Sequence, residues 1–325
     1  MNKLYPKTIS LIIGLIFLYL SVKDIELGYL LSQKIKINYI YLFLSSVILY
    51  LSIYIKAYRL KILLKKYKQL SFSTYTKPIL IRHFFNAALP GNLGEVAKPY
   101  VLKNYLKKPY FEFLSIVIIE RAFDLAVMLS IFWVALIFNQ IGLDLIYVLM
   151  FTFFFLLGLI LFYFLIISEN IFKLFPFVFL KQFKIGANNA LKDKYQIIKV
   201  SLITIFLWII LCSADFFLFL SFDVLNEIVT IPNIIFLTCL IVIAQLIPST
   251  PSSIGLFNYL VIQTLEFFFT VNNIDFDLSL KTQITSISFI VLFISVLPDI
   301  TWGLFVFIKE TSLKLKDLKL FSDKI

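Results

Sequence analysis

Histidine and cysteine are scarce in this sequence, which has one histidine and two cysteines among 325 residues. Cys212 and Cys239 lie within apolar runs without a CxxC spacing, so neither a disulfide framework nor a zinc site is indicated. His83 stands next to Arg82, and we expect a packed or solvated ring rather than a catalytic one. The spacings of a P-loop, a serine triad and a dinucleotide-binding loop are also missing, so no cofactor is expected.

Charged residues are sparse too, at 15% of the chain against 61% hydrophobic residues, and the mean hydropathy is +0.95. So much apolar sequence exceeds what a soluble core can enclose, and the composition predicts an all-α polytopic membrane protein. The net charge of +11 comes with lysines in the gaps between apolar runs, which is typical of cytoplasmic loops. We therefore expect no nucleic-acid partner.

The apolar runs approach the roughly 20 residues that cross a bilayer. They predict six spanning helices, at about 8–22, 39–55, 111–138, 143–167, 199–220 and 283–307. Two further apolar regions, 78–106 and 232–270, are each interrupted by a Pro/Gly cluster. We interpret them as re-entrant helical hairpins that enter and leave on one side of the membrane.

The distribution of Lys and Arg tests this layout. Twenty of these residues fall in the segments 1–7, 56–77, 168–199 and 309–325, and four fall in 23–38, 139–144, 221–231 and 271–281. This asymmetry predicts that both termini are cytoplasmic in the cell membrane. The Lys-rich and Lys-poor segments fall on opposite sides of the membrane only if neither hairpin crosses the bilayer.

The chain 1–325 is then one domain, an inverted repeat with halves of about 1–140 and 141–310 and a short basic tail at 311–325. Segment 168–199 is either an interfacial amphipathic helix or a solvated loop.

The first hairpin turns at LPGNLGEVAKPY, residues 89–100. Asn92 and Glu95 have the spacing of a capping box, which predicts a short helix after the turn. Its N-terminus and Lys98 form a natural site for a phosphate, and Gly91 and Gly94 allow close approach of a ligand or a neighbouring backbone. The alternative is that the glycines only permit a tight turn and close packing.

A second cluster, Glu120, Arg121 and Asp124, lies inside the predicted helix 111–138. Charged groups at membrane depth are candidates for function by default, and Arg121 and Asp124 are spaced to pair within the helix. Arg82 completes a balanced set with the charged residues of the first hairpin. The alternative is an internal ion-pair network that pins the hairpin to this helix.

The second hairpin turns at IPSTPSSIGLFN, which offers the hydroxyls of Ser252 and Ser253. Asp215, Glu266 and Asp299 lie in or near apolar runs of this half without obvious cations. Each of them faces water, titrates, or reaches across to the basic side chains of Arg82, Lys98 and Arg121.

Three blocks of the chain resemble the lysylphosphatidylglycerol synthase transmembrane-domain family, also called flippase-like: LPGNLGEVAKPYVL, ERAFDL and IPSTPSSIGLFN. By this resemblance the family's motif positions are Gly91, Gly94, Glu95, Lys98, Glu120, Arg121 and Asp124. The third block departs from the family pattern, which has a Gly-Gly pair and a Glu near Ser252-Ser253 and Asn258. In members that make aminoacylated lipids, the membrane unit is fused to a cytosolic transferase domain and moves the modified lipid to the outer leaflet.

Together these features predict a lipid translocase or lipid-binding transporter for an anionic lipid with a phosphate headgroup. Lys98, Arg121 and Arg82 would engage the phosphate, assisted by Gly91, Asn92, Gly94, Ser252 and Ser253, with Glu95, Glu120 and Asp124 neutralising the empty site. About 17 residues follow the last predicted helix, too few for a catalytic domain, so lipid aminoacylation by this chain alone is not expected. The alternatives are a glycosyltransferase using Asp275 and Asp277, or an accessory subunit of a separate lipid-modifying transferase.

Overall fold

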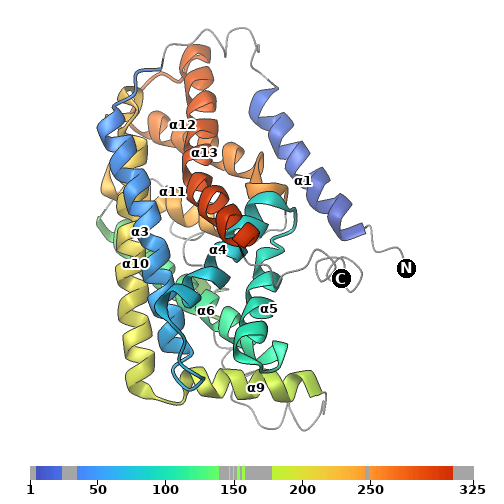
Figure 1. The fold of residues 1–325 in the computed structure, drawn as a ribbon. Coiled ribbons are helices and arrows are strands. Elements are labelled where there is room, and N and C mark those ends of the chain that lie inside the picture. Colours follow the sequence, from blue (N-terminus) through green and yellow to red (C-terminus); the bar gives the residue numbers. More distant parts are fainter. Residues whose placement is uncertain are drawn as a thin grey trace.

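The computed structural model describes residues 5–23, 35–138, 178–245 and 249–309, with a few further positions between 146 and 157. Its α-helices are α1 Tyr5–Val22, α3 Tyr39–Leu63, α4 Phe72–Ala88, α5 Gly94–Leu106, α6 Tyr110–Phe138, α9 Val178–Leu191, α10 Lys194–Leu220, α11 Ile231–Ala244, α12 Leu256–Val271 and α13 Leu278–Lys309 (Figure 1). Two short 3-10 turns, η1 Asp223–Leu225 and η2 Pro251–Ser253, precede α11 and α12. Within these ranges the only strand-like pairing is an isolated bridge between Ile37 and Phe222. The all-α prediction is therefore confirmed for the described residues.

Four of the described helical segments are long and apolar enough to cross a bilayer: Tyr39–Leu63, Lys194–Leu220, Pro251–Val271 and Leu278–Lys309. The structure thus supports a helical membrane protein. The predicted helix 143–167 and the basic tail 311–325 lie outside the described residues. The count of six spanning helices and two re-entrant hairpins stays a prediction.

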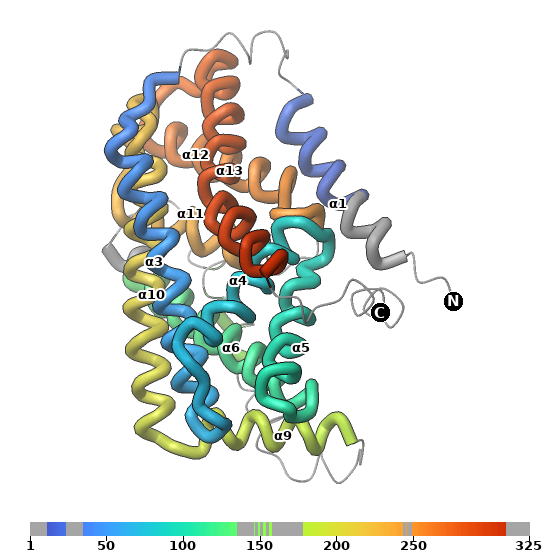
Figure 2. Tube along the Cα trace, viewed as in Figure 1, coloured from blue at the N-terminus to red at the C-terminus, as the bar shows by residue number. Residues whose placement is uncertain are grey.

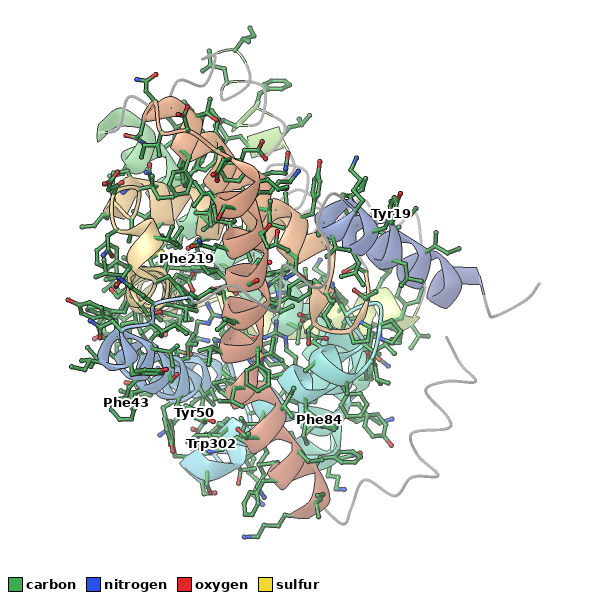
Figure 3. All side chains as sticks on the ribbon, turned by 90° about the horizontal axis from the view of Figure 1, so that it is seen from above. Tyr19, Phe43, Tyr50, Phe84, Phe219 and Trp302 are labelled. Carbon is green, nitrogen blue, oxygen red and sulfur yellow. The ribbon has the colours of Figure 1, made fainter. Side chains whose placement is uncertain are left out.

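Many large apolar side chains point away from the molecule, as in a lipid-facing surface. Tyr19 and Phe43 are each 66% exposed, whereas Phe219 on α10 is 1% exposed (Figure 3). The buried apolar residues form two main clusters, one among α6 and α10 to α13 and the other among α3 to α6 and α9. Residues of both clusters border the cavity described below.

The helices α3 and α10 form a long antiparallel pair, and α9 lies crosswise at the end where α3 ends and α10 begins (Figure 1). The side chains of Asn38 and Asp193 cap the first turns of α3 and α10. The predicted end of the second apolar run at 55 is wrong, because α3 continues to Leu63. This extension places Lys56 and Arg59 inside a helix instead of a loop.

Helices α4 and α5 form one helix-turn-helix pair, and α11 and α12 form a second one that approaches from the opposite end (Figure 2). Their turns meet between the two ends of the bundle. There the backbone amide of Gly91 donates a hydrogen bond to the Ser249 carbonyl at 3.0 Å, and the Asn92 side chain donates to the Gln245 carbonyl at 2.7 Å. Residues 246–248, which include Pro248 of the second turn, lie outside the described residues.

Both turns contain residues with left-handed backbone conformations. Gly91 has φ of 80° and Asn92 has φ of 55°, while Ser252 and Ser253 have φ of 54° and 56°. Glycine adopts such angles without steric cost, but serine does so only under constraint from its surroundings. The structure therefore holds both turns in defined and partly strained shapes.

Gly94 permits close packing of the first turn of α5 against α4. A Cβ atom at this position would overlap the carbonyl oxygen of Arg82 and the side-chain oxygen of Asn86. The Asn86 oxygen also accepts a hydrogen bond from the Gly94 amide at 2.7 Å. At Gly94 the structure therefore shows close packing against protein groups, which is the alternative that the sequence analysis gave for this glycine.

We predict that Gly94→Ala lowers the stability of the protein by about 1–3 kcal/mol, because the new methyl group forces α5 away from α4. The check is the midpoint of thermal unfolding of the purified protein in detergent. Ser73→Ala, at an exposed position on α4, is the matched control and leaves the midpoint unchanged. An unchanged midpoint for Gly94→Ala would contradict this packing.

Candidate functional site

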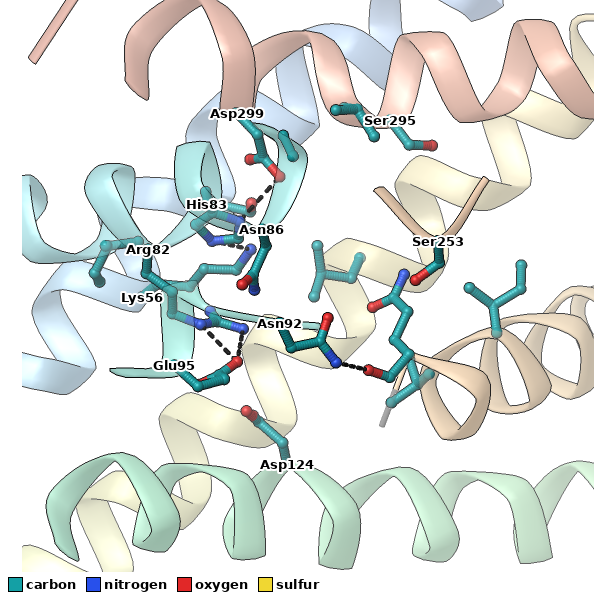
Figure 4. A pocket seen from close by; sticks show the side chains of 18 of the residues that line it. Lys56, Arg82, His83, Asn86, Asn92, Glu95, Asp124, Ser253, Ser295 and Asp299 are labelled. Carbon is teal, nitrogen blue, oxygen red and sulfur yellow. Dashed lines mark hydrogen bonds and ion pairs between the residues drawn. The ribbon is translucent and has the colours of Figure 1, made fainter. Parts of the chain in front are cut away.

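A cavity of about 640 Å³ lies where the two turns meet. Its polar wall comes from α3, α4, α5 and α6, which bring basic and acidic side chains together (Figure 4). Much of its apolar wall comes from α10 to α13, and includes Leu211, Ile241, Phe257 and Leu292. The basic side chains of the cavity thus all come from α3 to α6, while α10 and α13 add the carboxylates of Asp215 and Asp299 to a mainly apolar lining.

Two ion pairs lie deepest in the polar wall. The Lys98 ammonium of α5 bonds the Glu120 carboxylate of α6, and these side chains are 4% and 5% exposed. The Arg59 guanidinium of α3 makes a bidentate contact with Asp124 of α6, with its second hydrogen bond at 3.2 Å. These pairs join three helices, so the predicted network that pins the first hairpin to α6 exists.

Asp124 has further partners that fix its position. The indole N–H of Trp208 on α10 donates to this carboxylate at 3.3 Å, and Arg121 lies 3.8 Å from it within α6. Arg59 also donates to the hydroxyl of Thr204 on α10 at 3.2 Å. A charged group this well satisfied can remain buried at low cost.

Glu95 is shared by two arginines closer to the cavity. One oxygen, Oε1, accepts hydrogen bonds from Arg82 Nε at 2.9 Å and from Arg121 Nη2 at 2.7 Å. The other oxygen has no hydrogen-bond partner in the described part of the chain. The side chains of Arg82 and Arg121 are 14% and 32% exposed, so they are the more accessible cations of this wall.

A third group links α3, α4 and α13. His83 Nδ1 lies 3.0 Å from a carboxylate oxygen of Asp299, and the Lys56 ammonium lies 3.4 Å from His83 Nε2. All three residues line the cavity (Figure 4). The observed partner of Asp299 is thus His83, which none of the three expectations for this residue named.

The predicted capping role of Asn92 is wrong, because its amide contacts Gln245 and not the first turn of α5. The amide groups at the start of α5 are already used inside the protein. Gly94 donates to Asn86, Glu95 to the Asn92 carbonyl, and both Val96 and Ala97 to the Leu93 carbonyl. This N-terminus therefore offers a phosphate few free donors, and the arginine side chains remain the available ones.

The other candidates fall into two groups. Gly91, Asn92, Ser252 and Ser253 line the cavity together with Asp215, whose carboxylate accepts a hydrogen bond from Thr238 at 2.8 Å. Glu266 bonds Gln263, and Asp277 accepts from the amide of Leu280 at the start of α13. Neither Glu266 nor Asp277 is among the residues that line the described cavity.

Lys56 and Arg59 were missed by the sequence analysis because they were assigned to a basic loop. Their spacing in the sequence could have indicated that they lie on a helix. Ser52, Lys56 and Arg59 follow the i, i+4, i+7 pattern of one helix face, which the structure turns toward the cavity.

A bundle of apolar helices around a buried, charge-balanced cavity defines an integral membrane protein with a polar internal site. The profile of the family described as "Lysylphosphatidylglycerol synthase TM region" matches residues 7–274, and the chain belongs to this family. The resemblance found in the sequence is thereby confirmed. A search of curated proteins gives no match, and a search of solved structures gives none either. The family indicates a membrane protein in lipid metabolism or transport.

The Lys98–Glu120 pair gives a prediction for stability. Glu120→Gln leaves a buried ammonium without its counter-charge and destabilises the protein by about 3–5 kcal/mol, whereas the double variant Lys98→Met/Glu120→Met recovers most of this loss. Thermal unfolding in detergent measures both effects. A control is Lys65→Ala, which breaks an exposed pair of 3.8 Å with Asp193 and changes stability by less than about 1 kcal/mol. A double variant as unstable as the single one would show that more than charge balance holds α5 to α6.

Proposed function

We propose that the protein is a lipid translocase or lipid-binding transporter for an anionic lipid with a phosphate headgroup. The observation that carries this proposal is the concentration of charge in the cavity: every Lys and Arg that lines it comes from α3 to α6, and α10 to α13 line it mainly with apolar side chains. An amphipathic ligand fits such a cavity with its headgroup against α3 to α6 and its acyl chains toward α10 to α13. A soluble metabolite would leave the apolar wall without a matching group.

Arg121 and Arg82 are the residues that contact the phosphate in this proposal. Both keep donor groups beyond those given to Glu95, since a guanidinium has five N–H donors. Planar guanidinium groups also suit bidentate phosphate binding. Lys98 acts differently from the sequence-based expectation, because its ammonium is fully buried against Glu120 and supports the wall.

We further propose that α4–α5 and α11–α12 are re-entrant hairpins that enter from opposite sides of the cell membrane, with both termini cytoplasmic. Support comes from the turns that meet tip to tip. Exposed lysines also gather at one end of the bundle, in the segments between α3 and α4, α5 and α6, and α9 and α10. That end would face the cytoplasm.

The glycosyltransferase alternative receives no support from the described residues. Asp277 caps the start of α13, which is a structural role for one of its two required carboxylates. An accessory role beside a separate lipid-modifying transferase predicts a stable complex with that enzyme. It also predicts that cavity substitutions leave transport by the purified protein unaffected.

Arg121→Gln should slow lipid movement by about 10- to 100-fold, since it removes a charge-assisted contact of about 1.5–3 kcal/mol. The measurement is dithionite quenching of fluorescent phosphatidylglycerol in proteoliposomes containing the purified protein. Lys108→Gln, an exposed lysine away from the cavity, is the control and retains the wild-type rate. Normal transport by a correctly inserted Arg121→Gln protein refutes the role of this arginine.

The topology can be tested by labelling single cysteines in intact cells, with both native cysteines replaced by alanine. Lys68→Cys and Lys108→Cys flank α4–α5 and should react only from the cytoplasmic side. Glu227→Cys and Asn272→Cys flank α11–α12 and should react only from outside. Opposite sidedness within either pair would mean that the corresponding segment crosses the bilayer.

A further inference from the structure

The charges lining the cavity balance. Five basic side chains face five acidic ones: Lys56, Arg59, Arg82, Lys98 and Arg121 against Glu95, Glu120, Asp124, Asp215 and Asp299. With every carboxylate ionised, the empty site carries no net formal charge. A phosphodiester headgroup would therefore leave one unbalanced negative charge in a region of low dielectric constant, which is costly. A positive charge must enter with it.

His83 is the neutral base positioned to take up this charge. With Lys56 protonated, its ammonium can only donate, so His83 Nε2 must be the acceptor in their 3.4 Å contact. The ring proton then lies on Nδ1 and is donated to Asp299 at 3.0 Å. The imidazole of the empty site is therefore neutral. The charged groups that act on it are Lys56 from α3, Arg82 from α4 and Asp299 from α13.

We propose that binding of a monoanionic lipid headgroup is coupled to the uptake of one proton by His83, an inference that rests on the proposed function. The Lys56 ammonium turns from His83 Nε2 to the phosphate, where it joins Arg82 and Arg121, and Nε2 takes up a proton from the buffered solvent. Asp299 holds the Nδ1–H throughout and balances the imidazolium. The headgroup adds one negative charge, the proton adds one positive charge, and Lys56 keeps its own.

This coupling has a consequence for transport. A lipid that crosses together with its proton moves no net charge across the membrane. Its distribution between leaflets then responds to a pH difference and not to the membrane potential.

Asp215 is the rival site for the proton. Its carboxylate also lines the cavity and accepts a hydrogen bond from the neutral hydroxyl of Thr238. Protonation there would balance the headgroup equally well. It would leave the Lys56 contact with His83 unchanged.

The test is calorimetric titration of the full chain, in nanodiscs of zwitterionic lipid, with short-chain phosphatidylglycerol in buffers of different ionisation enthalpy. Wild type should take up about one proton per bound lipid. Its affinity should fall about tenfold per pH unit in the range between the imidazole pKa of the empty site and that of the lipid-bound site. His83→Gln should lose both the proton uptake and the pH dependence. The control Glu227→Gln, an exposed carboxylate between α10 and α11, should keep both.

The outcomes separate this inference from the proposed function. Binding by wild type without proton uptake overturns the inference and leaves the proposed function intact. Uptake that persists in His83→Gln and disappears in Asp215→Asn also overturns it, because the proton is then on Asp215. No binding at any pH overturns the proposed function and the inference together. If His83→Gln fails to fold, a wild-type count near zero still overturns the inference, and uptake of one proton that persists in Asp215→Asn still supports it.

Discussion

Charge pairing inside an apolar helix bundle is the constraint on which the rest of this structure depends. An unpaired buried charge costs several kcal/mol, so Lys98 and Arg59 require the carboxylates of α6. Because these partners come from three helices, satisfying the charges also fixes how α3, α5 and α6 pack. The same contacts create a polar wall in a protein whose outer surface is apolar. In this half of the chain, the ion pairs that fix the helix packing are therefore the same ones that form the polar lining of the cavity.

The charged side chains differ in whether they remain accessible to a ligand in the cavity. Lys98 and Glu120 are almost fully enclosed, whereas Arg82 and Arg121 share one oxygen of Glu95 and border the cavity. A phosphate can therefore use the outer arginines without breaking the inner pairs. This arrangement separates the groups that maintain the fold from those that can exchange partners.

The sequence predicted the helical membrane class, the broken segments and the acidic and basic residues of the first hairpin and α6. It did so because helix breakers and charges are conspicuous in apolar sequence. It placed Lys56 and Arg59 in a loop, since a basic helix end and a basic loop look alike without knowledge of the acids that face them. The partner of Asp299 also could not be predicted, because His83 lies 216 positions away in the chain. The prediction that Asn92 caps α5 is wrong for a related reason. Its side chain bonds the distant Gln245 carbonyl instead of the first turn of α5.

One of the hydrogen bonds between the two turns runs from the Gly91 amide to the Ser249 carbonyl, so it involves main-chain atoms alone. Its donor and acceptor exist in every residue type, except that proline lacks the N–H. This bond therefore does not depend on the side chain at 249, although that position is 1% exposed and has room only for a small residue. The Gly91–Ser249 bond is equally independent of the side chains at Ser252 and Ser253, where this chain departs from the family pattern. Proline at 91 would remove its donor, and its fixed negative φ is incompatible with the φ of 80° found there.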